Sequence, residues 1–579
     1  MSYSSVLSAS RDGTRGRSLL STDCIVAVLF IVVYACVIHA FEYRGGFAES
    51  DLYRVLVGLL DGADSGRGIA SPLHYDRDFG FGYLAAFYAF AAPATLHDPD
   101  KLTALMNQVG FWSMIPGLML FWCAVCLAHG SRAATIALVI FALGPMNPEM
   151  FTSGHPTIPM FAFLCAGAVL LFLPLSGWKA VLAAAAAAVL LLAGMVTRGE
   201  IFLAFPWIVL SRADTRSIRS FIVSACLRAI APASALIAFV LLQHRLQSVV
   251  QAELSSTVGG YFREFYTSLA TIVPGLVYMA VGCGIVTVVA AAIAGLYAIG
   301  GAFARAASAN GLARQLPGPL ALILVPTLFF LPNPVPSRHF EMTLAGFAIL
   351  IGIVLAQRPA SGRPALGRVA ALGIALAIGA GNQVMAEAVR PTLLRINQAH
   401  SPYLPLPEAY PTATHADLGW GWRRHATLVA RRTAWNALGN RIATSCDAHL
   451  IVLSDEVEQI FSRLYAGGVP VTANRVTIQV EPGAAAEATP AGDSTRVLMV
   501  GVGAPRLPGL IGVRDGKTFV MVEKDHAWPY DPVATVLADP AYRDYKIIAD
   551  PYTMSVFDKT PIPADRVPRF GCADGGPRQ

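Results

Sequence analysis

The sequence predicts an α-helical polytopic membrane protein, with about eleven transmembrane helices, followed by a C-terminal soluble α/β domain. Three observations support this prediction. The chain of 579 residues is 55% hydrophobic and only 14% charged, its mean hydropathy is +0.54, and its long apolar runs all lie before residue 387. Soluble domains carry roughly a quarter charged residues. The net charge of +6 has no dense cluster, so it indicates a lipid bilayer rather than nucleic acid as partner.

Residues 1–21 are predicted to form a cytoplasmic N-terminus. Arg11, Arg15 and Arg17 precede the first apolar run, 22–40. A signal peptide begins in the same way, but here no small-x-small cleavage site leads into soluble sequence, and more apolar runs follow. We therefore expect a retained first span that starts on the inside.

The predicted transmembrane region covers residues 22–386. A helix needs about 20 apolar residues to cross a bilayer, and eleven runs reach or approach that length, with 201–211 the shortest. They are 22–40, 105–128, 133–150, 157–175, 179–197, 201–211, 221–243, 270–298, 318–332, 341–357 and 366–386.

The orientation follows from the basic residues of the short loops. Loops 129–132, 176–179, 211–220, 305–314 and 357–368 hold most of the Arg and Lys of the short connections. By the positive-inside rule all of them are cytoplasmic. This arrangement requires that 81–96 be an interfacial or re-entrant helix rather than a span. It also places the C-terminal residues 387–579 outside.

The first outside loop, 41–104, is long and acidic. Within it, FAESDLYRVLVGLLDG (47–62) has one narrow polar stripe and a broad apolar face, the pattern of an amphipathic helix. We expect this helix and the segment 81–96 to lie flat in the outer interface. Glu49 and Asp51 would then sit at the water-facing rim of the membrane.

The C-terminal residues 387–579 have the alternation of an α/β domain. Strands are predicted at 449–454, 475–480, 496–503, 518–524 and 545–550, and a helix is predicted at 455–468. The glycines of GVGAPRLPG (501–509) do not fit G-x-G-x-x-G, so no nucleotide site is predicted. Cys446 and Cys572 are the only cysteines of this region, and whether they pair is left open.

Charged residues recur at the outer ends of spans. Arg198 and Glu200 lie in VTRGE, and Arg338 and His339 lie in NPVPSRHFEM. Ionisable groups at membrane depth are costly and are usually functional or paired. The alternative for each is an interfacial salt bridge whose side chains reach water. We expect these residues to face one cavity together with the loop residues Glu49, Asp51, Arg77 and Asp78.

This order of motifs resembles the GT-C superfamily of polytopic glycosyltransferases, especially the branch of aminoarabinose transferases and protein O-mannosyltransferases. The resemblance covers roughly residues 20–360 and depends on the order and sidedness of four segments. These are Glu49-Ser-Asp51-Leu-Tyr53, HYDRDFGFGYL (74–84), GHPTIPMFAF (154–163) and GMVTRGE (194–200).

The resemblance implies a membrane glycosyltransferase that moves a sugar from a polyprenyl-phosphate donor to a periplasmic glycan or lipid acceptor. It implies that Asp51 or Glu49 is the general base and that Arg198 and Arg338 hold the phosphate. The remaining substrate-binding candidates are Arg77, Asp78, His155, Glu200 and His339. Two positions depart from the family pattern: His155 replaces an acid, and Asp78 beside Arg77 replaces a lysine. No cofactor or metal is predicted, and the need for a divalent metal is left open.

The chemistry suits these residue types. Glycosyl transfer passes through an oxocarbenium-like state, so a nearby carboxylate can accept the acceptor proton and stabilise positive charge. The leaving lipid phosphate gains negative charge, which a forked guanidinium stabilises. The resemblance and the alanine- and arginine-rich composition together indicate a bacterial inner membrane, with the C-terminal domain in the periplasm.

Two other functions are compatible with the sequence. A transporter or flippase of lipid-linked material predicts paired repeats and broken helices with polar groups near mid-bilayer. A non-catalytic protein of envelope-polymer assembly would keep the scaffold and bind through residues 387–579. Chargeable groups gather at one face of the predicted bundle, which favours the enzyme.

Overall fold

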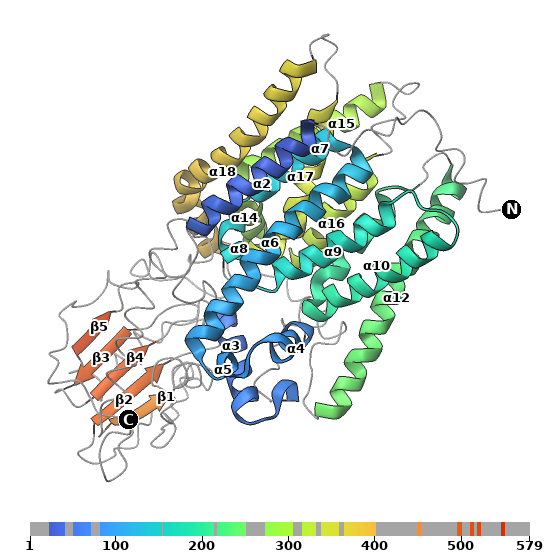
Figure 1. Cartoon of the computed structure of the whole chain (residues 1–579). Coiled ribbons are helices and arrows are strands. Elements are labelled where there is room, and N and C mark those ends of the chain that lie inside the picture. Colours follow the sequence, from blue (N-terminus) through green and yellow to red (C-terminus); the bar gives the residue numbers. More distant parts are fainter. Residues whose placement is uncertain are drawn as a thin grey trace.

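The computed structural model describes residues 22–40, 50–70, 81–152, 154–213, 217–250, 272–304, 315–331, 337–357 and 364–400, together with five strands after residue 447. The chain folds into a helical bundle with a layer of short helices at one end (Figure 1). The helices are α2 (Thr22–Ala40), α3 (Ser50–Asp64), η1 (Gly68–Ala70), α4 (Phe81–Phe90), α5 (Pro93–Leu96), α6 (Pro99–His129), α7 (Ser131–Ala142), α8 (Asn147–Thr152), α9 (Thr157–Phe172), α10 (Trp178–Thr197), η3 (Gly199–Ala204), α11 (Phe205–Leu210), α12 (Ile218–Val250), α14 (Ile272–Cys283), α15 (Ile285–Ala304), α16 (Pro317–Phe330), η6 (Ser337–Phe340), α17 (Glu341–Ala356) and α18 (Pro364–His400).

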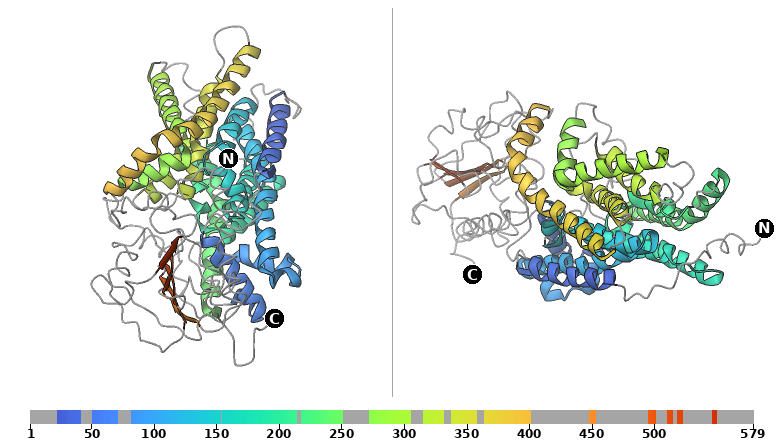
Figure 2. Two further views of the ribbon diagram at one scale, coloured as in Figure 1. Left: turned by 90° about the vertical axis from the view of Figure 1, so that its left-hand side faces the viewer. Right: turned by 90° about the horizontal axis from the view of Figure 1, so that it is seen from above.

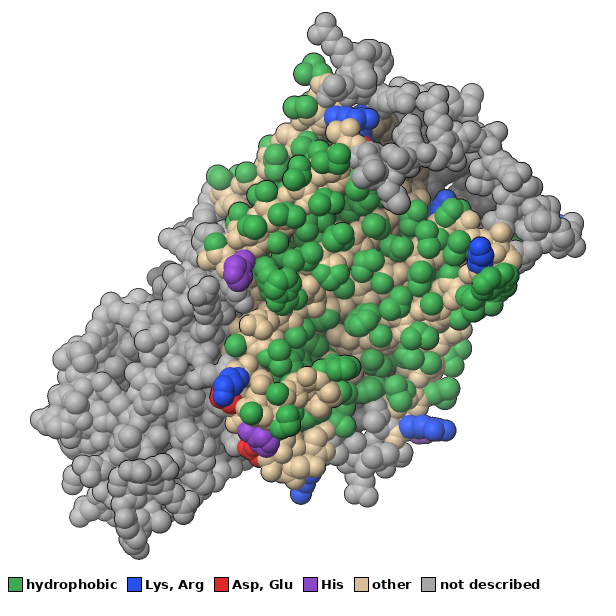
Figure 3. Space-filling view, viewed as in Figure 1, with side chains coloured by type: hydrophobic (Ala, Val, Ile, Leu, Met, Phe, Trp, Pro, Cys, Tyr) green, Lys and Arg blue, Asp and Glu red, His purple; other side chains and the backbone are tan. Residues whose placement is uncertain are grey.

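The bundle is that of a multi-pass membrane protein. Five of the described helices are long and apolar enough to cross a bilayer, namely those over 22–40, 101–129, 178–197, 218–245 and 366–385. Seven shorter apolar helices accompany them, among them α7, α9, α16 and α17. The outer helices α2, α10 and α12 expose large apolar side chains such as Val33, Val181 and Ile237. Figure 3 shows one such apolar face over the bundle, as expected for lipid contact.

The core of the bundle is built around α7 and α17. Residues 133–142 of α7 and 341–353 of α17 are all buried, and the two helices pack along each other. A helix that is hydrophobic all round belongs in the interior. Around this pair, α6 packs on α9 and α7, α9 packs on α10, and α16 packs on α17.

Two predicted spans are interrupted by non-helical residues in the structure. The predicted span 133–150 becomes α7 and the short helix α8. Pro145 lies between them, and it interrupts the helix because it has no backbone N–H to donate and its ring clashes with the preceding turn. The side-chain amide of Asn147 donates to the carbonyl of Phe141 near the end of α7. This amide satisfies one of the carbonyls that a helix end leaves open.

The predicted span 270–298 is broken at Gly284 into α14 and α15. Gly284 has a φ of +83°, and a Cβ there would lie 2.4 Å from Cγ of Asn382 on α18. The Asn382 oxygen accepts the backbone N–H of Thr287 at 3.1 Å, and its amide donates to the Thr287 hydroxyl at 2.8 Å. Asn382 therefore caps α15 from another helix. The break needs both a glycine and this distant partner.

The first loop contributes helices α3, α4 and α5, which pack at one end of the bundle (Figures 1 and 2). The predicted amphipathic helix is confirmed as α3, whose residues Val55, Leu56 and Leu59 are buried against α4 and α6. The segment 81–96 forms two helices, because Pro93 starts α5. With ten residues α4 is about 15 Å long, too short to cross a bilayer. Its place relative to the membrane remains a prediction.

Beyond residue 447 the structure describes five strands, β1 (Ala448–Val452), β2 (Thr495–Val500), β3 (Leu510–Arg514), β4 (Thr518–Val522) and β5 (Lys546–Ala549). Their order in one sheet is β1-β2-β4-β3-β5, with β1, β2 and β4 parallel and β3 antiparallel to both neighbours. Four of the predicted strands are present, and β3 was not predicted.

Several predicted features of this region lie outside the described residues. They are the strand 475–480, the helix 455–468, the segment 501–509 and both cysteines. The domain boundary at 387 remains a prediction, and α18 continues past it to His400.

Candidate functional site: a buried arginine beside an apolar cavity

Arg198 lies where α10 ends. The helix stops at Thr197, Arg198 adopts an extended backbone with a φ of −157°, and η3 begins at Gly199. This change of direction turns the Arg198 side chain into the protein, where it is only 1% exposed. A guanidinium buried to this degree needs charged and polar partners around it.

Glu200 supplies the main partner. Arg198 Nε donates to Glu200 Oε2 at 2.9 Å, and Nη2 donates to Oε1 at 3.0 Å. The contact is the two-pronged arrangement that guanidinium and carboxylate groups form when both are ionised. Glu200 is 5% exposed, so the pair is held away from water.

His155 and Thr157 contact the other side of the guanidinium. Arg198 Nη1 donates to the Thr157 hydroxyl at 2.8 Å. That hydroxyl lies 2.7 Å from His155 Nδ1, and the Thr157 backbone N–H also donates to Nδ1, at 3.3 Å. His155 Nδ1 is therefore an acceptor. Burial, reinforced by the positive charge of Arg198, holds the pKa of His155 well below its ordinary value, so this imidazole is neutral.

His339 approaches from η6. Its Nδ1 lies 2.7 Å from Glu200 Oε1 and 3.3 Å from Arg198 Nη2. Because an ionised carboxylate can only accept, His339 Nδ1 carries the proton of this hydrogen bond. We call His155, Thr157, Arg198, Glu200 and His339 the Arg198 cluster.

The structure brings together four of the residues predicted from the sequence, His155, Arg198, Glu200 and His339. They come from the α8–α9 turn, the α10–η3 junction and η6. Thr157 was missed, although it stands two residues after His155 in the quoted segment GHPTIPMFAF. Glu341, at the start of α17, also belongs to the segment NPVPSRHFEM and was not among the predicted site residues. Its two carboxylate oxygens are buried and have no hydrogen-bond partner among the described residues.

The other candidates are only partly described. Asp51 lies in the first turn of α3 and Arg338 lies in η6, but only their backbones are described. Glu49, Arg77 and Asp78 lie outside the described residues. The roles predicted for these five residues remain predictions. Among the described residues no group of three or more His, Cys, Asp or Glu side chains is arranged to hold a metal ion.

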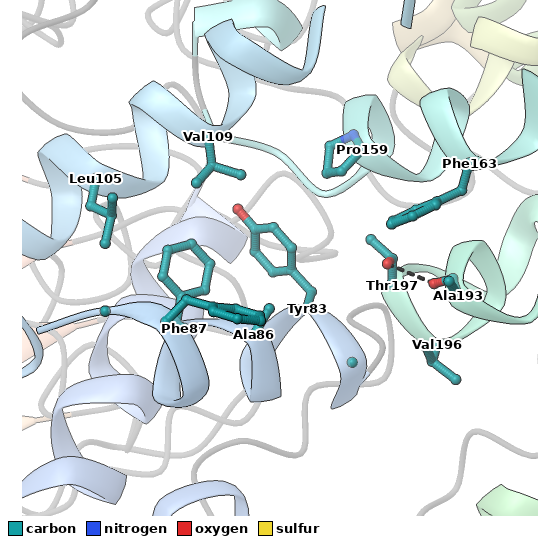
Figure 4. Close-up of a pocket in the computed structure, with 13 residues that line it drawn as sticks. Tyr83, Ala86, Phe87, Leu105, Val109, Pro159, Phe163, Ala193, Val196 and Thr197 are labelled. Atoms are coloured by element: carbon teal, nitrogen blue, oxygen red, sulfur yellow. Dashed lines mark hydrogen bonds between the residues drawn. The ribbon is translucent and has the colours of Figure 1, made fainter. Parts of the chain in front are cut away.

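An apolar cavity of about 370 Å³ is lined by Thr197, the residue before Arg198. Figure 4 shows its lining residues. The cavity lies between α4 and the facing parts of α6, α9 and α10, and Tyr83, Phe87, Leu105, Phe163 and Val196 are among its lining residues. Among the described lining residues, only Thr197 and Tyr83 carry a side-chain polar group, and the Thr197 hydroxyl donates to the Ala193 carbonyl at 2.8 Å. The cavity therefore suits an apolar ligand.

Two contacts hold α4 over this cavity. The Tyr83 hydroxyl donates to the carbonyl of Gly154, the residue before His155. Gly82 lets α4 approach α10, because a Cβ at this position would lie 2.5 Å from Val196 Cγ2. Gly154 itself has a φ of +71°, and its own Cβ would lie 2.4 Å from the Met106 carbonyl oxygen. The cavity and the His155 turn are thus built as one unit.

Two solved proteins superpose on much of this chain at low sequence identity. ArnT from Cupriavidus metallidurans bound to undecaprenyl phosphate superposes with a TM-score of 0.47 at 15% sequence identity, over 76% of this chain and 85% of that chain. The same protein in the apo state gives a TM-score of 0.42 at 12% identity, over 75% of this chain and 84% of that chain.

The archaeal oligosaccharyltransferase AglB from Archaeoglobus fulgidus, in complex with an inhibitory peptide and a dolichol-phosphate, gives 0.42 at 12% identity. That match covers 78% of this chain and 64% of AglB. At these identities each likeness concerns the arrangement of the helices alone. No protein-family model matches the chain, and neither does any curated protein.

Proposed function

We propose that the chain is a membrane glycosyltransferase that moves a sugar from a polyprenyl-phosphate donor to a glycan or lipid acceptor. The observation that supports it best is the junction of Thr197 and Arg198. Thr197 lines the apolar cavity, and the next residue is the centre of the buried charged cluster. A polyprenyl phosphate has the same two parts in sequence, an apolar chain and an anionic headgroup.

The Arg198 cluster would lie beside the donor phosphate. Among the described residues, the Arg198 guanidinium contacts Glu200, His155, Thr157 and His339. A phosphate bound by Arg198 directly would replace one of these partners. We therefore give Arg198 the role of holding the two histidines in place, and give Arg338, next to His339 in η6, the direct contact to phosphate.

The reaction needs a base on the acceptor side. The acceptor hydroxyl oxygen attacks the anomeric carbon, the bond from that carbon to the phosphate oxygen breaks, and the hydroxyl proton passes to Asp51, with Glu49 as the alternative base. The polyprenyl phosphate leaves with the electron pair of the broken bond. The carboxylate stabilises the positive charge that develops on the sugar ring. Arg338 stabilises the charge that develops on the phosphate.

Filling the cavity is expected to weaken donor binding. Ala86 lines the cavity and Ala89, one helical turn along α4, does not, while both side chains are exposed. Ala86→Trp is expected to weaken the binding of polyprenyl phosphate by roughly tenfold or more, the equivalent of about 1.4 kcal/mol. The measurement is equilibrium binding of a fluorescent polyprenyl phosphate to the purified protein in detergent. Ala89→Trp is the matched control and should bind as the wild type does. Equal binding by both variants would reject the cavity as the chain site.

One observation favours the transporter alternative, the helix break at Gly284. Discontinuous helices with polar groups are typical of transporter sites, and Thr287 and Asn382 are buried beside this break. Their side chains hydrogen-bond to each other. In proteoliposomes a flippase would move labelled lipid between leaflets without sugar transfer, whereas the proposed enzyme would release polyprenyl phosphate.

We also propose that the first loop and the C-terminal region face the periplasm of a bacterial inner membrane.

A further inference from the structure

The two histidines of the Arg198 cluster contact it in opposite ways. His155 Nδ1 accepts hydrogen bonds from Thr157, whereas His339 Nδ1 donates to Glu200. A neutral imidazole carries one proton, so the proton of His155 is on Nε2 and that of His339 is on Nδ1. Arg198 Nη1 lies 3.1 Å from His155 Nε2 and 3.2 Å from Nδ1, so the tautomer of His155 is assigned by its two Thr157 contacts and that of His339 by Glu200.

A further proton has one favourable place in the cluster. At His155 the proton would go to Nδ1. There it would break the hydrogen bond that Nδ1 accepts from the Thr157 N–H, and it would place a second positive charge beside the Arg198 guanidinium. At His339 it would go to Nε2 and leave the hydrogen bond from Nδ1 to Glu200 intact. A carboxylate that orients an imidazole in this way also stabilises the imidazolium.

We propose that His339 is the proton-binding group of the donor site, and that a lipid-borne phosphodiester binds together with a proton on His339 Nε2. This inference rests on the proposed function, because it takes the phosphate of the donor as the anion. Arg198 and Glu200 together are neutral. The added proton gives the cluster one positive charge, which matches the single negative charge of a phosphodiester.

The charges around His339 come from every side. Arg198 and Glu200 lie on the α10–η3 segment, His155 lies on the α8–α9 turn, and Glu341 follows on α17. On α14, Cys283 donates its S–H to the carbonyl of Phe340. The described part of α16 contributes no charged group, and its Phe330 ring lies 5.1 Å from the His339 ring. Among these groups Glu200 is the carboxylate in direct contact with His339.

The proposal predicts proton uptake on binding. The test uses isothermal titration calorimetry of a prenyl methyl phosphodiester into the purified protein in detergent, at pH 7.5, in two buffers with different heats of ionisation. An imidazole ordinarily titrates near pH 6.5, so the wild type is expected to take up a fraction approaching one proton per bound ligand. Affinity is then highest below about pH 6.5 and falls as pH rises, by at most about tenfold per pH unit. The phosphodiester keeps one charge throughout this range.

The variants separate His339 from other histidines. His339→Asn keeps a donor towards Glu200 but removes the proton site, so its binding is expected to be weaker, independent of pH and without proton uptake. His155→Asn is expected to keep the proton uptake on binding. So is His97→Gln, which changes an exposed histidine paired with Asp64. Unfolding midpoints verify that the variants fold. Wild-type binding without proton exchange, or uptake that persists in His339→Asn, would overturn the assignment of His339 alone. An absence of any phosphodiester binding would overturn the proposed function as well.

Discussion

Replacing Glu200 by alanine is expected to lower the free energy of unfolding by about 3–5 kcal/mol, the range seen when one partner of a buried ion pair is removed. The cost arises because Arg198, only 1% exposed, would keep its charge and lose its two strongest hydrogen bonds. The measurement is the unfolding transition of the purified protein in detergent.

Two controls separate the buried pair from ordinary charge effects. Lys101→Ala removes an exposed pair with Asp98, in which the lysine side chain is 64% exposed, and should cost less than about 1 kcal/mol. The double variant Arg198→Met with Glu200→Met is expected to recover most of the stability, because apolar residues can replace a buried pair without loss. It should remain unable to bind donor. If Glu200→Ala unfolds no more easily than Lys101→Ala, the cluster does not contain the buried pair described here.

Replacing Asp51 by asparagine is expected to lower the turnover of sugar transfer by roughly 10²–10⁴-fold, the usual contribution of a general base. Asparagine has nearly the same size but cannot accept the acceptor proton. Expression and membrane insertion should not change, because Asp51 lies at the start of α3, before the residues by which that helix packs. The measurement is transfer of a labelled sugar from polyprenyl phosphate to acceptor in membranes.

The comparison variants for this prediction lie on or beside the same helix. Asp64→Asn changes an exposed acid at the other end of α3 and should leave turnover unchanged. Glu49→Gln tests the alternative base. Full activity in both Asp51→Asn and Glu49→Gln would leave the proposed reaction without a base from this loop.

Local patterns in the sequence predict much of this structure. The apolar face of residues 51–60 predicts α3, and the apolar runs predict most helices to within a few residues. The position of charged residues at span ends also predicts that Arg198, Glu200 and His339 meet, because alternate span ends lie at the same face of a bundle. These features depend on neighbours in the chain or on the topology alone.

Other features depend on contacts that no local pattern contains. The break at Gly284 requires Asn382 on α18, and the sequence around 284 reads as one continuous apolar run. The direction of the Arg198 side chain also depends on distant contacts. The sequence predicts that Arg198 faces an open cavity, whereas in the structure its side chain points into the protein towards Glu200. Thr157 assigns the tautomer of His155, but a threonine at the start of a span gives no signal of this role. Side-chain direction and hydrogen-bond partners come from packing, which spacing does not specify.

The most direct test of the central claim is photo-crosslinking with a polyprenyl phosphate that carries a diazirine on its prenyl chain. Labelled peptides are expected to come from α4, from the first part of α6, from the start of α9 and from the end of α10, the segments that line the apolar cavity. Unlabelled polyprenyl phosphate should compete this labelling away. Labelling confined to the lipid-facing helices α2 and α12, and unchanged by the competitor, would contradict the claim that a lipid phosphate binds beside Arg198.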